Sequence, residues 1–70
     1  MNADRLVYMA NQIGKFFAAQ GDGAVDGTLD HLKKFWDPRM REQIVAHLQT
    51  GGAGLVTPAR EAVERLGDAG

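Results

Sequence analysis

Apolar residues in the first third of the chain recur every three or four positions, which is the spacing of one face of an α-helix. The positions on this face are Leu6, Met9, Ala10, Ile13, Phe16 and Phe17. They predict a helix over residues 3–20, which begins after an Asn2 cap and ends at the GDG sequence, residues 21–23. Gly14 interrupts this helix at a cost of about 1 kcal/mol relative to alanine. Because its bare backbone would allow another helix to approach closely, we favour a helix contact there within the chain over one between subunits.

A second helix is predicted over residues 24–36, and a proline marks the corner that follows it. Its narrow apolar stripe consists of Val25, Leu29, Leu32 and Trp36, and Asp22 is the candidate cap. A residue before proline is disfavoured in the α region, and an N-cap residue lies outside that region in any case. Asp37 is therefore expected to cap a third helix over residues 38–50, with Pro38 at its first position.

A glycine-rich stretch separates the third helix from a short fourth one. The apolar face of the third helix consists of Met40, Ile44, Val45 and Leu48. After a connector at residues 51–56, Thr57 and Pro58 repeat the cap-and-proline start and predict a helix over residues 57–66. Its apolar stripe is thin. We therefore expect it to be hinged at the connector, to pack weakly on the isolated chain and to dock on another protein.

These patterns together predict an all-α fold. It is a small three-helix bundle, at residues 3–20, 24–36 and 38–50, with a short hinged fourth helix at residues 57–66. The expected organisation along the chain is a helical domain at residues 1–50, a connector at 51–56, and a short C-terminal helix and tail at 57–70.

The composition argues against a catalytic cleft enclosed by the core of this chain. The 70 residues form one domain, and a domain near this size buries only about 60% of the surface that its unfolded chain exposes. The chain has no cysteine for a disulfide, a thiolate metal cluster or a nucleophile, and it has no serine. Domains of this size commonly rely on disulfides, metals or partner subunits for stability. A partner is the option left open, including a second copy of the isolated chain.

The N-terminal residues and the apolar patterning indicate a soluble intracellular protein. A net charge of −1 gives no general attraction to nucleic acid or to anionic lipid. The first residues, MNADRLVYMANQIG, carry charges and amides and lack the apolar run of a secretory signal. The chain also lacks a run of about 18 apolar residues, which a membrane span would need.

Neither the histidines nor the glycine-rich connector predicts a catalytic or metal site. Zinc needs three or four convergent ligands, and nothing in the sequence pairs His31 with His47. A phosphate-binding loop needs Lys and then Ser or Thr after its glycines, whereas Leu55 and Val56 follow here. We therefore expect no catalytic, cofactor-binding or metal-binding residue in this chain.

Four positive charges gather around the corner between the second and third predicted helices: Lys33, Lys34, Arg39 and Arg41. They favour nucleic-acid binding, and two helices joined by a tight turn resemble a helix-turn-helix motif. Against this interpretation, the turn contains Asp37, and the third helix lacks the polar face that reads bases. A free-standing helical adaptor or nucleic-acid-binding regulator is kept as the alternative function.

The two arginines of this corner occupy different sides of the third predicted helix. Both lie in its first turn, where a cation opposes the helix dipole by about 0.3–1 kcal/mol. Arg39 projects away from the apolar face, whereas Arg41 falls within it and must extend to solvent, stack on a ring such as Trp36, or meet a carboxylate. A carboxylate on this chain would make Arg41 structural, and one on another chain would make it an interface anchor. Trp36 has the same two roles open to it, with core packing favoured.

Three stretches of the chain, taken in order, resemble one protein family. They are MANQIGKFF at residues 9–17, FWDPRMR at residues 35–41 and HLQTGGAGL at residues 47–55, before the short helix that starts with a proline. Together they resemble the delta subunit of NAD-dependent, molybdenum-containing formate dehydrogenase. The resemblance implies a non-catalytic accessory subunit of a cytoplasmic complex, which supports assembly, cofactor insertion or stability of the catalytic subunit.

The same resemblance assigns the cofactors to the partners of this chain. It implies a large catalytic subunit with a molybdenum-pterin cofactor, and a complex that also contains iron-sulfur clusters and FMN and uses NAD. The positions that it carries over as candidates for the partner interface are Asn11, Gln12, Trp36, Pro38, Arg39, Met40, Arg41, Gly51, Gly52 and Gly54.

Overall fold

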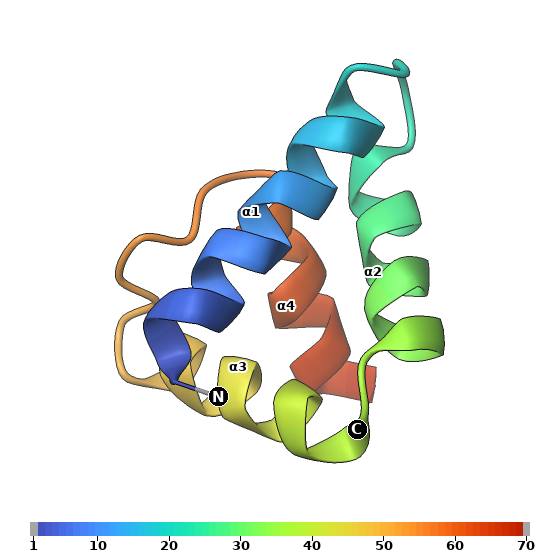
Figure 1. The fold of residues 1–70 in the computed structure, drawn as a ribbon. Helices are drawn as coiled ribbons and strands as arrows, with labels where there is room; N and C mark the ends of the chain where they lie inside the picture. Colours follow the sequence, from blue (N-terminus) through green and yellow to red (C-terminus); the bar gives the residue numbers. More distant parts are fainter. Residues whose placement is uncertain (1, 70) are drawn as a thin grey trace.

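The structure, a computed structural model, describes residues 2–69 and contains four α-helices (Figure 1). They are α1 (Ala3–Ala18), α2 (Ala24–Phe35), α3 (Pro38–Gln49) and α4 (Ala59–Ala69). No strand occurs in this part of the chain. The predicted all-α class is confirmed, and each of the first three helices begins where the sequence predicts and ends one or two residues earlier.

The helix caps predicted at Asn2 and Asp37 are present. The side chains of Asn2 and Asp37 each accept a hydrogen bond of 2.9 Å from the backbone N–H three residues later. The predicted cap at Asp22 is wrong. Gly23 holds the N-cap position of α2 with a left-handed φ of 85°, and its carbonyl accepts the bond from the N–H of Gly27. Because glycine adopts that backbone conformation readily, the cap lies one residue beyond the expected one, while the helix itself begins at Ala24 as predicted.

The last helix packs at the centre of the fold. Figure 1 shows α4, drawn in orange to red, between the other three helices, and it contacts all of them. Ala59, Ala62 and Val63 are fully buried. The expectation that this helix packs weakly is therefore wrong. Its small side chains let the neighbouring helices approach closely enough to cover a thin apolar stripe completely.

The start of α4 also differs from the sequence prediction. The helix begins at Ala59, so Pro58 lies just before it, and the carbonyl of Pro58 accepts the hydrogen bond from the N–H of Ala62 at 3.0 Å. The predicted placement of Pro58 inside the first turn is one position too early. The helix continues to Ala69, beyond the predicted end at residue 66.

Gly14 is the point at which α1 meets the start of α4. A Cβ atom on Gly14 would lie 3.2 Å from the backbone nitrogen of Ala59 and 3.3 Å from Cγ of Pro58. These distances are shorter than ordinary van der Waals contact, and backbone and proline atoms cannot move far enough to relieve them easily. The close helix contact predicted at Gly14 is confirmed, and it lies within the chain.

All four helices contribute to one hydrophobic core. Its largest fully buried side chains are Leu6 of α1, Thr28 and Leu32 of α2, Ile44 of α3 and Val63 of α4. The hydroxyl of Thr28 donates to the carbonyl of Ala24 at 2.7 Å, so this buried polar group keeps a partner. Each buried Leu, Ile or Val side chain stabilises the fold by about 1.5–3 kcal/mol relative to an exposed position.

Candidate functional site

Arg41 of α3 closes the C-terminal end of α2. Its Nη1 atom donates a hydrogen bond to the carbonyl oxygen of Lys33 at 3.2 Å and another to that of Trp36. Carbonyls in the last turn of a helix lack helical partners and carry the negative end of the helix dipole. Arg41, which lies on the apolar face of α3, therefore binds backbone carbonyls of its own chain. This class of partner is not among the three that its sequence position suggests.

The other candidate residues at this corner divide between the core and the surface. Trp36 is only 4% exposed and belongs to the core, and Met40 is half-buried against it. Pro38 and Arg39 are exposed. In this conformation, Pro38 and Arg39 are thus the corner candidates that present their side chains to solvent.

Two of the four positive charges at the corner have partners on the chain. Arg41 is bound to the end of α2, and Nζ of Lys34 lies 3.1 Å from the carboxylate of Asp30. Lys33 and Arg39 are the other two, one at the end of α2 and one at the start of α3. The surface of the corner therefore presents fewer free positive charges than the sequence alone indicates.

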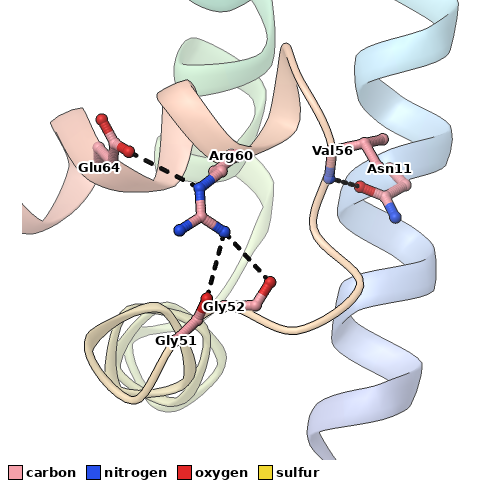
Figure 2. A network of polar contacts seen from close by, with 6 residues as sticks. All are labelled: Asn11, Gly51, Gly52, Val56, Arg60 and Glu64. Carbon is pink, nitrogen blue, oxygen red and sulfur yellow. Dashed lines mark hydrogen bonds and ion pairs between the residues drawn. The ribbon is translucent and has the colours of Figure 1, made fainter.

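Side chains of α3 and α4 hold the glycine-rich connector. Figure 2 shows Nη1 of Arg60 donating to the carbonyl oxygens of Gly51 and Gly52, each at 3.3 Å. On the α3 side, Nε2 of His47 lies 2.8 Å from the carbonyl oxygen of Ala53. Three successive carbonyls of the expected flexible connector are therefore bound to side chains.

Asn11 of α1 binds the same connector with both ends of its amide. Nδ2 donates to the carbonyl oxygen of Gly54 at 2.8 Å. Oδ1 accepts from the N–H of Val56 at 3.1 Å, and Figure 2 shows this second bond. A side-chain amide that donates and accepts in this way replaces a backbone peptide as the partner of an irregular segment. The asparagine in the first stretch and Gly54 in the third are thus in direct contact.

Nine of the ten candidate interface residues form two groups at opposite ends of α3. Asn11 and the connector glycines lie at its C-terminal end, and the corner residues lie at its N-terminal end. The rise of the helix separates the two ends by about 17 Å. Gln12 belongs to neither group and is exposed on α1.

A row of aromatic side chains lies on α1 and α2, outside both groups. We call Phe16, Phe17, His31 and Phe35 the aromatic row. The ring centroids are 5.2 Å apart for Phe16 and Phe17, 6.4 Å for Phe17 and His31, and 4.7 Å for His31 and Phe35. Phe16 is 59% exposed and Phe35 72% exposed, so the two ends of the row project into solvent.

The sequence alone does not single out the aromatic row as a site. Its apolar spacing places Phe16 and Phe17 on the apolar face of the first predicted helix and gives Phe35 no role of its own. A usable signal was present, since the row contains every phenylalanine of the chain and all of them lie in the MANQIGKFF and FWDPRMR stretches. Apolar rings gathered on a surface are more informative than single exposed ones.

The described residues provide no arrangement for metal chemistry. Within residues 2–69, no three His, Asp or Glu side chains lie close enough together to hold a metal ion. No helix among them combines the length and the apolar character needed to cross a membrane. The surface features that stand out are therefore the aromatic row and the exposed corner residues.

Comparison with protein families gives one match, which spans most of the chain. The family model of the NADH-dependent formate dehydrogenase delta subunit, FdsD, matches residues 5–63. No curated protein and no solved structure gives a match. The matched range runs from α1 into α4 and includes Asn11, the corner, the connector and the aromatic row. The chain therefore belongs to the family of formate dehydrogenase delta subunits.

Proposed function

We propose that this chain is a non-catalytic accessory subunit of a cytoplasmic, NAD-dependent formate dehydrogenase complex. Its role is to support assembly, cofactor insertion or stability of the large molybdenum-containing catalytic subunit. The larger subunits would carry the molybdenum-pterin cofactor, the iron-sulfur clusters and FMN. The observation that carries this proposal is the family match over residues 5–63.

The side chains of this chain support an accessory role. Its most specific polar contacts, those of Arg41, Asn11 and Arg60, are made to backbone atoms of its own helices and connector. These three side chains hold the fold, so they are engaged by the chain itself and are not directed at a substrate for acid-base or nucleophilic chemistry. Two phenylalanine rings remain exposed, as suits a protein that works by contact with another protein.

The deciding experiment compares the formate dehydrogenase complex produced with and without this chain. A tagged copy of the full chain is expected to recover the catalytic subunit from cells that contain the whole complex. Removal of the chain is expected to lower formate-dependent NAD reduction. If the tagged chain recovers no formate dehydrogenase subunit, or if its removal changes neither activity nor stability of the complex, the proposal is wrong.

The same preparations distinguish the three forms of the role. A defect in cofactor insertion leaves the subunits assembled but low in molybdenum, measured by mass spectrometry of the metal. A defect in assembly leaves the subunits in separate fractions on size-exclusion chromatography. A defect in stability leaves composition and initial activity normal, but the activity decays faster on heating.

The alternative function as a nucleic-acid-binding regulator is tested by its dependence on salt. A protein that neutralises several phosphates loses about 10³–10⁵ in affinity between about 50 and 200 mM salt. Because Arg41 and Lys34 have partners on the chain, we expect no such binding. Tight DNA binding that weakens steeply over this range would favour the alternative.

A further inference from the structure

We propose that the aromatic row is the surface by which the chain docks on a larger protein subunit, with the rings of Phe16 and Phe35 entering an uncharged, apolar hollow of that subunit. This inference rests on the proposed accessory function and adds the surface and the chemistry of the partner. It is carried by the exposure of the rings, their charge environment and the area that they offer.

The packing of this chain gives the exposed rings of Phe16 and Phe35 no role. The stretches that place the chain in its family also contain Asn11, Trp36 and Arg41, and each of these has a role inside the chain. Phe16 and Phe35 come from the same stretches, yet they project into solvent. A fully buried Phe ring contributes about 1.5–3 kcal/mol relative to an exposed one, and the isolated chain obtains only part of that contribution at both positions.

The charge along the row is low. The charged residues that precede His31 and Phe35 in α2 are Asp30 and Lys34, and these two pair with each other at 3.1 Å. Lys15, which precedes Phe16 in α1, adds one exposed positive charge. A single lysine beside an ion pair falls short of the cluster of about 4–8 Lys or Arg residues that is typical of a surface binding anionic lipid. The row matches an apolar protein surface, since aromatic side chains are enriched where protein interfaces bind most strongly.

The surface area that the two exposed rings offer favours a larger partner over a second copy of this chain. A phenylalanine side chain buries about 150–250 Å², so the exposed parts of the two rings offer roughly 250 Å² together. A stable interface uses about 800 Å² on each partner. The row alone is too small to hold two copies together, but it suffices as the central anchor of a contact that a larger subunit extends along α1.

The surface along α1 is suited to that extension. Tyr8, Gln12 and Phe16 are spaced four residues apart, so they lie on one side of the helix over about 12 Å. All of them are exposed. Tyr8 and Gln12 supply polar groups at the margin of the apolar row, in the arrangement of an interface with an apolar centre and a polar rim.

The test uses the full-length tagged chain with the double substitution Phe16→Ser and Phe35→Ser. Val56→Ser is the matched control, because Val56 is an apolar side chain that is 51% exposed and lies on the connector, outside the aromatic row. Each variant is produced together with the formate dehydrogenase subunits, and the amount of catalytic subunit recovered per tagged chain is measured. Thermal unfolding of each isolated variant, followed by circular dichroism, verifies that its fold is unchanged.

We expect the double variant to recover the catalytic subunit at least about tenfold less well than the wild-type chain, as for loss of an interface anchor. The Val56→Ser variant should recover it as the wild-type chain does. If the wild-type chain and the double variant recover it equally, the docking proposal is wrong while the accessory function stands. If the wild-type chain recovers no formate dehydrogenase subunit, both proposals are wrong.

Light scattering on the isolated chain tests whether a second copy of this chain, and not a larger subunit, covers the aromatic row. The proposal expects the wild-type chain and the double variant to have the same mass in solution. If the wild-type chain is a dimer and the double variant a monomer, the row is covered by a second copy, and the choice of a larger subunit is wrong.

Discussion

The guanidinium group of Arg41 donates to the carbonyl oxygen of Lys33 at 3.2 Å, so a side chain from the first turn of α3 satisfies the last turn of α2. A second bond from the same nitrogen reaches the carbonyl of Trp36. The arginine is unfavourable for the dipole of its own helix and favourable for that of the preceding one. This contact fixes the angle of the corner between the two helices.

The first prediction is that Arg41→Ala destabilises the isolated chain. Loss of the charged hydrogen bonds to α2 should lower the free energy of unfolding by about 1–2 kcal/mol. In a domain of this size, the melting temperature should then fall by roughly 5–15 °C. Arg39→Ala is the matched control, because Arg39 lies in the same turn and is exposed, and its effect should stay within about 0.5 kcal/mol. Equal melting temperatures for the two variants would contradict a structural role for Arg41.

The second prediction concerns the amide of Asn11. Asn11→Ala removes the bonds to Gly54 and Val56 and should lower the free energy of unfolding in urea by about 2 kcal/mol. Asn11→Asp should be at least as harmful at neutral pH, because a carboxylate oxygen would then face the carbonyl oxygen of Gly54. Hydrogen exchange at the N–H of Val56 should become faster in Asn11→Ala, which loses the oxygen that accepts this bond.

Gln12→Ala is the control for Asn11, because Gln12 is the next residue of α1 and is exposed. This variant should leave hydrogen exchange in the connector unchanged. If exchange at Val56 is as slow in Asn11→Ala as in the wild-type chain, then something other than the amide holds the connector.

The third prediction is that Gly14→Ala does not stabilise the chain. Replacing a glycine within a helix by alanine normally contributes about 1 kcal/mol of stability. Here the added Cβ would lie 3.2 Å from the backbone of Ala59, so we expect separation of α1 and α4 to cancel that gain. Gly14→Val should be clearly destabilising, by more than about 2 kcal/mol, since overpacking adds to the loss of helix propensity.

The reference for Gly14 is a pair of substitutions at the exposed position 12 of the same helix. Gln12→Ala should be more stable than Gln12→Gly by about 1 kcal/mol in thermal unfolding, which is the propensity difference without a tertiary contact. A comparable gain for Gly14→Ala would mean that α4 does not press on α1 at this point.

The fourth prediction is an energetic coupling between Gly52 and Arg60. A Cβ atom on Gly52 would lie 2.6 Å from Nη1 of Arg60, and the φ of 66° already disfavours alanine. Gly52→Ala should therefore displace the guanidinium from its carbonyl partners. In a double-mutant cycle, Gly52→Ala should cost about 0.5–1 kcal/mol less when Arg60→Ala is already present.

Gly51→Ala supplies the comparison for this cycle. Its φ of 120° also disfavours alanine, but no atom lies within 4 Å of the added Cβ. Its cost, measured by urea unfolding, should be the same with Arg60 and with Arg60→Ala. The absence of coupling at Gly52 would show that the arginine moves aside without loss.

Local patterns in the sequence determined most of the secondary structure. The apolar spacing of α1 requires no distant contact, and the chemistry of Asp37 and Pro38 acts within one turn. For this reason the class, the starts of the first three helices and the caps at Asn2 and Asp37 could all be predicted. The same locality explains the error at Asp22, because two adjacent residues competed for one cap and the backbone freedom of Gly23 decided between them.

Only the tertiary structure decided which residues are inside and which remain available to a partner. The burial of α4 depends on how closely α1 approaches at Gly14, and its own thin apolar stripe does not contain that information. Likewise, the partners of Arg41 and Asn11 are backbone atoms. Every residue has these atoms, so the residue types in the sequence do not indicate which of them will be bound. Phe16 and Phe35 are exposed although they are strongly apolar. Whether a side chain is buried depends on its position in the fold and not on its hydrophobicity alone.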